Sequence, residues 1–323
     1  MRLTHLLRSL RPALVAAGLA ALAATASAQT ALKVGGLKTI SLLPVSYAVE
    51  KGYFKREGLD VEVVTVNSGP AVISAVMSNS VQIGYSASLP VLFARVQNQP
   101  VRIFTAFTYE TTQPEGQWTW LVASERSGVK SVKDLAGKTI AINASSSLCE
   151  LLAREHLAKA GVAWDAVKKI VVPFPQMQAA LQLGNADAAC LVEPFRTNVR
   201  VAPAIKGVTL ASGSLAGGAP RYALDILFAK EDWGNANKDT LRRFNKGLKA
   251  ALDDFSRDRA AWRKLIADEF KLSPAVVSLM KSDLEFSDLL PKASDIQPLV
   301  DGLARHGLLS APLKAGDLIL PLN

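Results

Sequence analysis

Cysteine and histidine are scarce in this sequence. Its 323 residues include two cysteines and three histidines. Two cysteines are too few for an iron–sulfur cluster or a cysteine-ligated zinc site. Beyond the N-terminal segment, the histidines are His156 and His306, and their wide spacing disfavours a histidine-based metal site. We therefore expect no metal and no cofactor.

Long apolar runs and glycine-rich nucleotide motifs are missing as well. A transmembrane helix needs about 18 or more consecutive apolar residues, and only the N-terminus comes close to that length. Neither G-x-x-x-x-G-K-[ST] nor G-x-G-x-x-G occurs in the chain. These absences exclude a polytopic membrane protein and give no support to nucleotide chemistry.

Basic residues are in excess but are spread along the chain. There are 37 Lys and Arg against 28 Asp and Glu, a net charge of +9. No basic run is interleaved with aromatic residues, so nucleic acid is not an expected partner. Apolar residues make up 49% of the chain, enough for a packed core. The length is twice the roughly 150 residues of one domain, which predicts two lobes.

The first 28 residues have the three parts of a secretory signal peptide. Arg2, Arg8 and Arg11 precede an uninterrupted small apolar run at 13–24, and an Ala-Ser-Ala cleavage site ends at Ala28. We expect cleavage after Ala28, a periplasmic location, and a net charge of +6 for the mature chain.

Export also affects how the two cysteines are interpreted. In an oxidising compartment Cys149 and Cys190 could form a disulfide. A disulfide requires Cα atoms roughly 4.4–6.8 Å apart, which a sequence cannot establish, and free cysteine commonly serves as a small buried apolar residue. The sequence therefore leaves both states open.

Strands alternate with helices along most of the chain. Short apolar segments predict strands at 32–36, 59–66, 81–85, 101–107, 137–142, 169–172, 187–192 and 221–229. Helices are expected between most of them, and helices at 237–270, 274–281 and 295–305 form a C-terminal cover. This alternation predicts an α/β fold with mainly parallel sheets.

The same order of elements recurs about 105 residues later. Residues 75–77 correspond to 180–182, Ser88 corresponds to Glu193, and the loop 37–41 corresponds to 143–147. The constant spacing predicts two similar βαβαβ lobes. Chance resemblance between two βα units is the alternative.

Several stretches carry a family resemblance. They are AVEKGYFKREGLDV at 48–61, VQIGYS at 81–86, VKDLAGKTIA at 132–141, and DAA at 187–189 followed by Glu193-Pro194-Phe195. Together they resemble the periplasmic solute-binding proteins of the nitrate/sulfonate/taurine class of ABC importers, which share their fold with thiamine-pyrimidine-binding proteins.

The resemblance implies a two-lobed periplasmic binding protein fold of type II. Lobe 1 would comprise 29–120 and 222–323, lobe 2 would comprise 121–221, and the chain would cross near Trp120 and return near Arg221. It implies a non-enzymatic, monomeric protein that delivers a small solute to a membrane permease and its ATPase. Some fungal relatives make the thiamine pyrimidine with a Cys-rich iron motif, which two separated cysteines do not match.

Ligands of open parallel sheets gather where strands end and helices begin. The candidate ligand-binding residues at such positions are Lys38, Thr39, Ser41, Ser68, Gly69, Ser86, Ser88, Tyr109, Ser145, Ser146, Ser147 and Glu193. Three successive serines facing Ser86 and Ser88 favour an anionic or strongly accepting ligand group, as in sulfonates, taurine or nitrate. Helix capping is the alternative for any one serine. Glu193 is expected to cap its own helix or to accept a hydrogen bond from the ligand.

A second hypothesis is an exported serine hydrolase. Residues 84–88 resemble the G-x-S-x-G nucleophile elbow, with Ser88 in place of the last glycine. Ser86 would be the nucleophile, and the general base would have to be His156 or His306. Both histidines are expected at the surface instead, which disfavours the hydrolase. Trp118 and Trp120 are expected on one side of a crossing strand, either packed in the core or stacked on a ligand.

Overall fold

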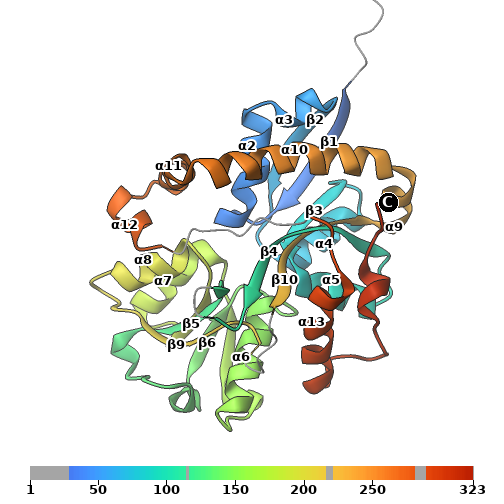
Figure 1. Cartoon of the computed structure of the whole chain (residues 1–323). Helices are drawn as coiled ribbons and strands as arrows, with labels where there is room; N and C mark the ends of the chain where they lie inside the picture. The colour runs from blue at the N-terminus through green and yellow to red at the C-terminus, as the bar shows by residue number, and fades with distance from the viewer. Residues whose placement is uncertain (1–28, 114–115, 216–220, 281–288, 323) are drawn as a thin grey trace, which may run out of the picture.

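Two five-stranded sheets form the framework of the protein, and each lies in its own half of the molecule (Figure 1). The computed structural model describes residues 29–113, 116–215, 221–280 and 289–322. The first sheet has the order β2-β1-β3-β10-β4 and the second has the order β7-β6-β8-β5-β9. The strands of the first are β1 (Thr30–Gly36), β2 (Leu59–Thr65), β3 (Ile83–Ala87), β4 (Val101–Thr111) and β10 (Arg221–Lys230). Those of the second are β5 (Trp120–Ala123), β6 (Thr139–Ile142), β7 (Lys168–Val171), β8 (Ala188–Leu191) and β9 (Val208–Ser212).

In each sheet a single strand runs against the other four. β1 is parallel to β2 and β3, whereas β10 pairs antiparallel with both β3 and β4. In the second sheet β6 is parallel to β7 and β8, and β5 pairs antiparallel with β8 and β9. The expectation of mainly parallel sheets is therefore confirmed, since four strands of each sheet run in the same direction. The fifth strand, β10 in the first sheet and β5 in the second, runs in the opposite direction.

Strand pairing confirms the predicted internal repeat. The two central strands β1 and β6 make equivalent pairs with their neighbours: Val34 pairs with Val63 and Ile83, and Ile140 pairs with Lys169 and Ala188. The corresponding positions differ by 106, 106 and 105 residues. The shared register of both pairs favours the repeat over chance resemblance.

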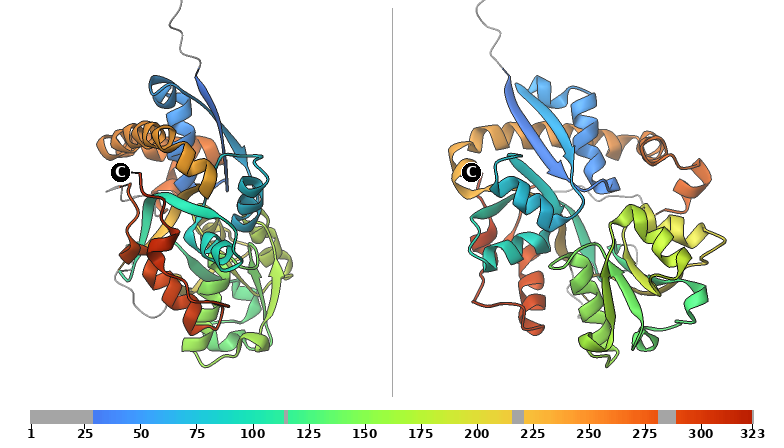
Figure 2. Two further views of the ribbon diagram at one scale, coloured as in Figure 1. Left: turned by 90° about the vertical axis from the view of Figure 1, so that its right-hand side faces the viewer. Right: turned by 180° about the vertical axis from the view of Figure 1, so that it is seen from behind.

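Helices flank both sheets (Figures 1 and 2). In the first half they are α2 (Leu43–Glu50), α3 (Tyr53–Arg56), α4 (Gly69–Met77) and α5 (Ser88–Val96). In the second half they are α6 (Leu148–Lys159), α7 (Phe174–Leu183) and α8 (Phe195–Val201). The C-terminal part contains α9 (Glu231–Ala236), α10 (Lys238–Arg257), α11 (Arg259–Phe270), α12 (Pro274–Ser278) and α13 (Ala293–Arg305).

The prediction of a single helix at 237–270 is wrong, because the helix is interrupted at Asp258. The backbone of Asp258 leaves the helical region, with φ −128° and ψ 85°. Its carboxylate accepts a hydrogen bond from the Ala261 backbone N–H at 2.9 Å and caps α11. Asp is a preferred N-cap residue, so the sequence contains the start signal of a second helix.

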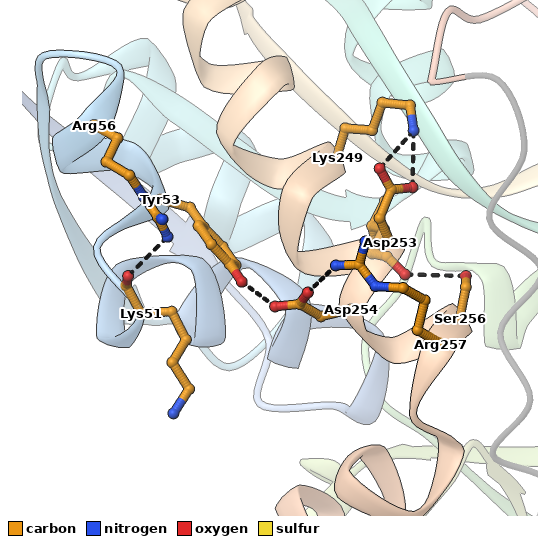
Figure 3. Close-up of polar contacts among 9 residues, drawn as sticks. Lys51, Tyr53, Arg56, Lys249, Asp253, Asp254, Ser256 and Arg257 are labelled. Atoms are coloured by element: carbon orange, nitrogen blue, oxygen red, sulfur yellow. Dashed lines mark hydrogen bonds and ion pairs between the residues drawn. The ribbon is translucent and has the colours of Figure 1, made fainter.

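The C-terminal helices contact both halves of the molecule. α10 packs on α2 and α3, where Phe54 stacks on Phe244 with ring centroids 4.4 Å apart. Figure 3 shows the polar contacts beside this packing: the Tyr53 hydroxyl donates to Asp254, which also pairs with Arg257. α12 contacts α8, and α13 contacts β10, α5 and α6. This part of the chain therefore spans the two sheets.

Glu110 ties together the two segments that cross between the sheets. One of its carboxylate oxygens accepts hydrogen bonds from the backbone N–H of Trp118 at 2.7 Å and of Thr119 at 3.0 Å, and from the Thr119 hydroxyl at 2.9 Å. Its other oxygen accepts from the Ser214 N–H at 2.8 Å. Residues 118–119 lead into the second sheet, and residue 214 leads out of it. A single fully buried carboxylate thus joins both crossings.

Cys149 and Cys190 form a disulfide, which resolves the state that the sequence leaves open. Cys149 lies in the first turn of α6 and Cys190 in β8, and their Cα atoms are 5.5 Å apart. The bond closes a loop with a sequence separation of 41 residues within the second half.

The remaining expectations concern the N-terminal segment and the limits of the two lobes. The expected signal peptide 1–28 lies outside the described residues. Among the described helices, none is both long and apolar enough to cross a membrane. Strands of the first sheet come from 30–111 and 221–230, and strands of the second come from 120–212. The lobe boundaries at 120/121 and 221/222 stay a prediction.

Candidate functional site

A cavity lies where residues of the two sheets meet. The cavity has a volume of about 70 Å³ and lies within about 670 Å³ of unfilled space that includes open solvent. The first half contributes Leu37, Thr39, Ile40, Ser41, Gly69, Tyr85, Ala87, Pro90, Leu224 and Asp225. The crossing segment and the second half contribute Trp118, Thr119, Asn143, Ser147, Leu148, Cys149, Phe174, Val192 and Glu193.

Most of the polar lining comes from segments that follow a strand. Thr39 and Ser41 follow β1, Gly69 follows β2 as the first residue of α4, Ser147 follows β6 as the N-cap of α6, and Glu193 follows β8. This is the edge of an α/β sheet at which ligands bind. The chain therefore brings together two sets of strand-to-helix loops, as the sequence predicts.

Gly69 is required by close packing at this edge. A Cβ atom at this position would lie 2.4 Å from Cγ of Pro90. A proline ring is held in place by the backbone, so it cannot turn away as a long side chain could. Only glycine allows α4 to begin this close to α5.

Asp225 stands in the cavity wall at the end of a chain of hydroxyl groups. The Tyr85 hydroxyl donates to Oδ1 of Asp225 at 3.0 Å, and it lies 2.9 Å from Oγ1 of Thr39. Because the single Tyr85 proton goes to Asp225, Thr39 is the donor to Tyr85. Burial raises the pKa of Asp225 to about 6, against the opposing effect of the Ser41 and Tyr85 hydroxyls.

Glu193 forms hydrogen bonds with the helix that follows it, α8, and an ion pair with Arg196. It accepts hydrogen bonds from the Thr197 backbone N–H at 3.1 Å and from the Thr197 hydroxyl at 2.9 Å. Arg196 lies 3.4 Å away and stacks on the ring of Trp120. Burial raises the pKa of Glu193, and the Thr197 bonds and the Arg196 charge oppose that rise. The capping role expected for Glu193 is therefore present.

The remaining walls are mostly apolar and include two large aromatic rings. Trp118 is 5% exposed and Phe174 is 7% exposed, and Phe174 stacks on Phe195 with centroids 5.7 Å apart. Of the two tryptophans expected on the crossing strand, Trp118 lines the cavity while Trp120 packs against Arg196. These surfaces suit the flat or apolar body of a small solute.

Five of the twelve residues predicted to bind the ligand line this cavity. They are Thr39, Ser41, Gly69, Ser147 and Glu193. Of these, Ser147 also caps α6, because its hydroxyl accepts from the Glu150 N–H at 3.4 Å and donates to the Ala144 carbonyl at 2.6 Å. Direct contact of any of the five with a ligand stays a prediction.

The other predicted residues lie outside the lining, and all of them except the exposed Ser145 have other partners in the structure. Lys38 pairs with Glu269 of α11 at 2.7 Å. The fully buried hydroxyls of Ser86 and Ser88 donate at 2.7 Å to the carbonyls of Ala87 and Ala223. Ser68 caps α4, Tyr109 stacks under Arg221, Ser145 is exposed, and the Ser146 N–H donates to Glu150 at 2.8 Å.

The structure gives the hydrolase hypothesis no support. Ser86 is fully buried and does not line the cavity. His156 is bonded to the Gly213 carbonyl at 2.8 Å, and His306 lies 3.3 Å from Glu155. Both histidines, expected at the surface, are half-buried. Within the described parts of the chain, no cluster of three His, Cys, Asp or Glu side chains could hold a metal.

Sequence reasoning missed Asp225, the acidic residue of the first half that lines the cavity. It lies in the predicted strand 221–229, whose apolar pattern indicates a buried core strand. The available signal was the only acidic residue within that strand, because a charge is rarely buried without a reason. Asn143 was noticed only as part of a polar loop, although it lines the cavity.

Comparison with known proteins places the chain in a family. A family described as "NMT1/THI5 like" matches residues 39–258, more than half of the chain. The taurine-binding periplasmic protein of Escherichia coli K12 is 27% identical over 250 residues, which cover 76% of this chain and 73% of that protein. A 4-amino-5-hydroxymethyl-2-methylpyrimidine phosphate synthase of Schizosaccharomyces pombe is 29% identical over 98 residues, 30% of this chain and 27% of the synthase.

The fold agrees with the sequence match. The alkanesulfonate-binding protein SsuA of Xanthomonas axonopodis pv. citri, solved with bound MOPS, superposes with a TM-score of 0.77 at 20% identity. The superposition covers 91% of this chain and 99% of SsuA. The chain therefore belongs to the NMT1/THI5-like family and has the two-lobed fold of the periplasmic binding proteins.

Proposed function

We propose that this protein captures a small solute in the cavity between its two sheets and delivers it to the permease and ATPase of an ABC importer. The observation that carries the proposal is the cavity itself, which residues from the strand-to-helix loops of both sheets line together. The names of relatives that bind taurine and alkanesulfonates support it.

We propose a non-enzymatic role. The match to the yeast synthase covers 30% of this chain, whereas the match to the taurine-binding protein covers 76%. The two cysteines are joined in a disulfide, so they do not supply the thiolates of a Cys-rich iron motif.

We propose that the solute presents an anionic or strongly accepting group to the N-termini of α4 and α6. Gly69 begins α4, Ser147 caps α6, and both line the cavity. The first N–H groups of a helix have no partner within the helix and favour negative charge. A sulfonate, as in taurine and alkanesulfonates, has the acceptor oxygens that such a site would bind.

We propose export to the periplasm through the segment 1–28. The disulfide between Cys149 and Cys190 supports this location, because disulfides persist in oxidising compartments. Intact-mass measurement of the exported protein should give a chain that begins at Gln29. A mass that includes residues 1–28 would contradict the proposal.

Binding should bring the two lobes together as rigid bodies, since two segments near Trp120 and Arg221 connect the sheets. Small-angle scattering at saturating ligand should then give a smaller radius of gyration than the free protein. An unchanged scattering curve under proven binding would argue against closure.

Solute capture is tested by a thermal-shift screen of the purified protein. The panel contains sulfonates, carboxylates, nitrate, amino acids and pyrimidines. A solute present at 100 times its Kd should add about 2.7 kcal/mol to the free energy of unfolding. A panel in which no solute raises the midpoint would refute the proposal.

A further inference from the structure

The cavity contains more negative charge than its walls compensate. Two buried carboxyl groups line it, Glu193 and Asp225, and the described lining includes neither lysine nor arginine. Glu193 has Arg196 at 3.4 Å. Asp225 takes part in none of the ion pairs among the described residues, and its contacts are hydroxyl groups, Tyr85 at 3.0 Å among them.

An uncompensated carboxylate in this position is costly. Asp225 is 8% exposed, and removing a carboxylate from water without a cation is strongly unfavourable. The raised pKa of about 6 expresses that cost, yet it leaves the group mostly ionised at neutral pH. A positive group on the solute would supply the missing counter-charge.

A second acceptor points to the same chemistry from the other sheet. Asn143 is 8% exposed and lines the cavity, and its carbonyl oxygen Oδ1 is fully buried without a hydrogen-bond partner among the described residues. A buried acceptor without a donor costs free energy that a ligand N–H would recover. Asn143 follows β6 and Asp225 belongs to β10, so the two acceptors come from different halves of the molecule.

We propose that the solute carries an ammonium or comparable charged N–H donor group, which pairs with Asp225, and that Asn143 accepts a further N–H from the solute. This inference rests on the proposed solute capture and narrows it. The protein then selects an amine-bearing solute over an otherwise equal solute without the amine. The anionic group proposed for the helix N-termini lies elsewhere on the same molecule, so a zwitterion satisfies both ends.

Matched pairs of probes test this selection by calorimetry. The pairs are taurine and ethanesulfonate, 3-aminopropanesulfonate and propanesulfonate, and 4-(aminomethyl)benzoate and 4-methylbenzoate. Within each pair that binds, the ammonium member should bind about ten- to a hundredfold more tightly, the range for a hydrogen bond to a charged group. Asp225→Asn should abolish that preference while leaving the affinity of the other member within about threefold.

Two further variants keep the result interpretable. Asp295→Asn is the matched control, because Asp295 is 9% exposed and belongs to α13, outside the cavity lining; it should retain the full preference. Asn143→Ala should weaken the ammonium member of a pair several-fold and not the other member. This arm also provides the test if Asp225→Asn fails to fold.

The outcomes separate the inference from solute capture. Binding of a pair with equal affinity, or tighter binding of the member without the amine, overturns the role of Asp225 and leaves solute capture standing. A preference that survives in Asp225→Asn, or that is undiminished in Asn143→Ala, overturns the assignment of that residue. A protein that binds no member of any pair, yet responds to another solute of the screen, overturns the inference alone; one that binds nothing overturns both.

Discussion

Replacing Glu110 by glutamine should destabilise the crossing between the two lobes. The substitution preserves the size of the side chain but exchanges one carboxylate oxygen for an NH2 group. In the structure both oxygens are acceptors: one receives three hydrogen bonds from residues 118 and 119, and the other receives the Ser214 N–H at 2.8 Å. The single amide oxygen of glutamine can accept either from residues 118 and 119 or from the Ser214 N–H. Its NH2 group must then face the donors that remain.

The expected loss of stability follows from the more favourable of the two orientations of the glutamine amide. If the amide oxygen accepts the three bonds from residues 118 and 119, the Ser214 N–H faces the NH2 group and loses its acceptor. A buried unsatisfied N–H costs about 1–3 kcal/mol. Burial raises the pKa of Glu110, so a neutral side chain relieves part of the cost of burying the charge. We expect a net loss of about 2 kcal/mol in the free energy of unfolding.

Urea unfolding followed by tryptophan fluorescence measures this change. The midpoint should fall while the slope stays constant, because the surface exposed on unfolding is the same. Glu125→Gln is the control: Glu125 is exposed and pairs with Lys206 at 3.1 Å, so its loss should change stability by less than about 0.5 kcal/mol. A Glu110→Gln protein as stable as wild type would refute the view that the Glu110 carboxylate stabilises both crossings through its two oxygens.

Three other substitutions test the disulfide, the close packing and the buried acid. The double variant Cys149→Ala, Cys190→Ala should lose about 4 kcal/mol in urea unfolding, the loop-closure value for the 41-residue separation, and an unchanged midpoint would contradict this. Gly69→Ala places a Cβ 2.4 Å from Pro90, so we expect a loss of about 1–3 kcal/mol together with weaker solute binding; a neutral result would show that the proline moves freely. The pKa of Asp225 is raised to about 6 from 3.8, so its stabilising contribution is complete below the unfolded value and is lost as the pH rises through 6. Wild type should therefore lose stability relative to Asp225→Asn between pH 4 and pH 7, and a constant difference across that window would count against the shift.

The positions of the strands could be predicted well, because they depend on local sequence: the alternation of apolar residues and the turn residues at each end. The strand predicted at 59–66 is observed at Leu59–Thr65, and the one predicted at 187–192 is observed at Ala188–Leu191. The repeat was also readable, since equivalent loops recur at constant spacing. The break at Asp258 was overlooked because the apolar pattern continues on both sides of a capping residue.

The site was harder to predict because it depends on the direction of side chains. Five residues of the predicted loops line the cavity: Thr39, Ser41, Gly69, Ser147 and Glu193. A serine after a strand has the same sequence pattern whether it faces a ligand or a backbone carbonyl. The reversed strand β10 brings Asp225 beside Tyr85 from 140 residues away, and no local pattern shows that pairing.

We propose that a solute binds in the cavity between the two sheets. Calorimetry of the tightest solute from the screen on wild type and on Ala87→Phe tests it most directly, because Ala87 lines the cavity at the end of β3 and is half-buried. A phenyl ring there should fill part of the space while the unliganded protein keeps its fold. We predict one site per chain in wild type and at least about a tenfold loss of affinity in the variant. Equal affinity in the two proteins would place the solute elsewhere and contradict binding in this cavity.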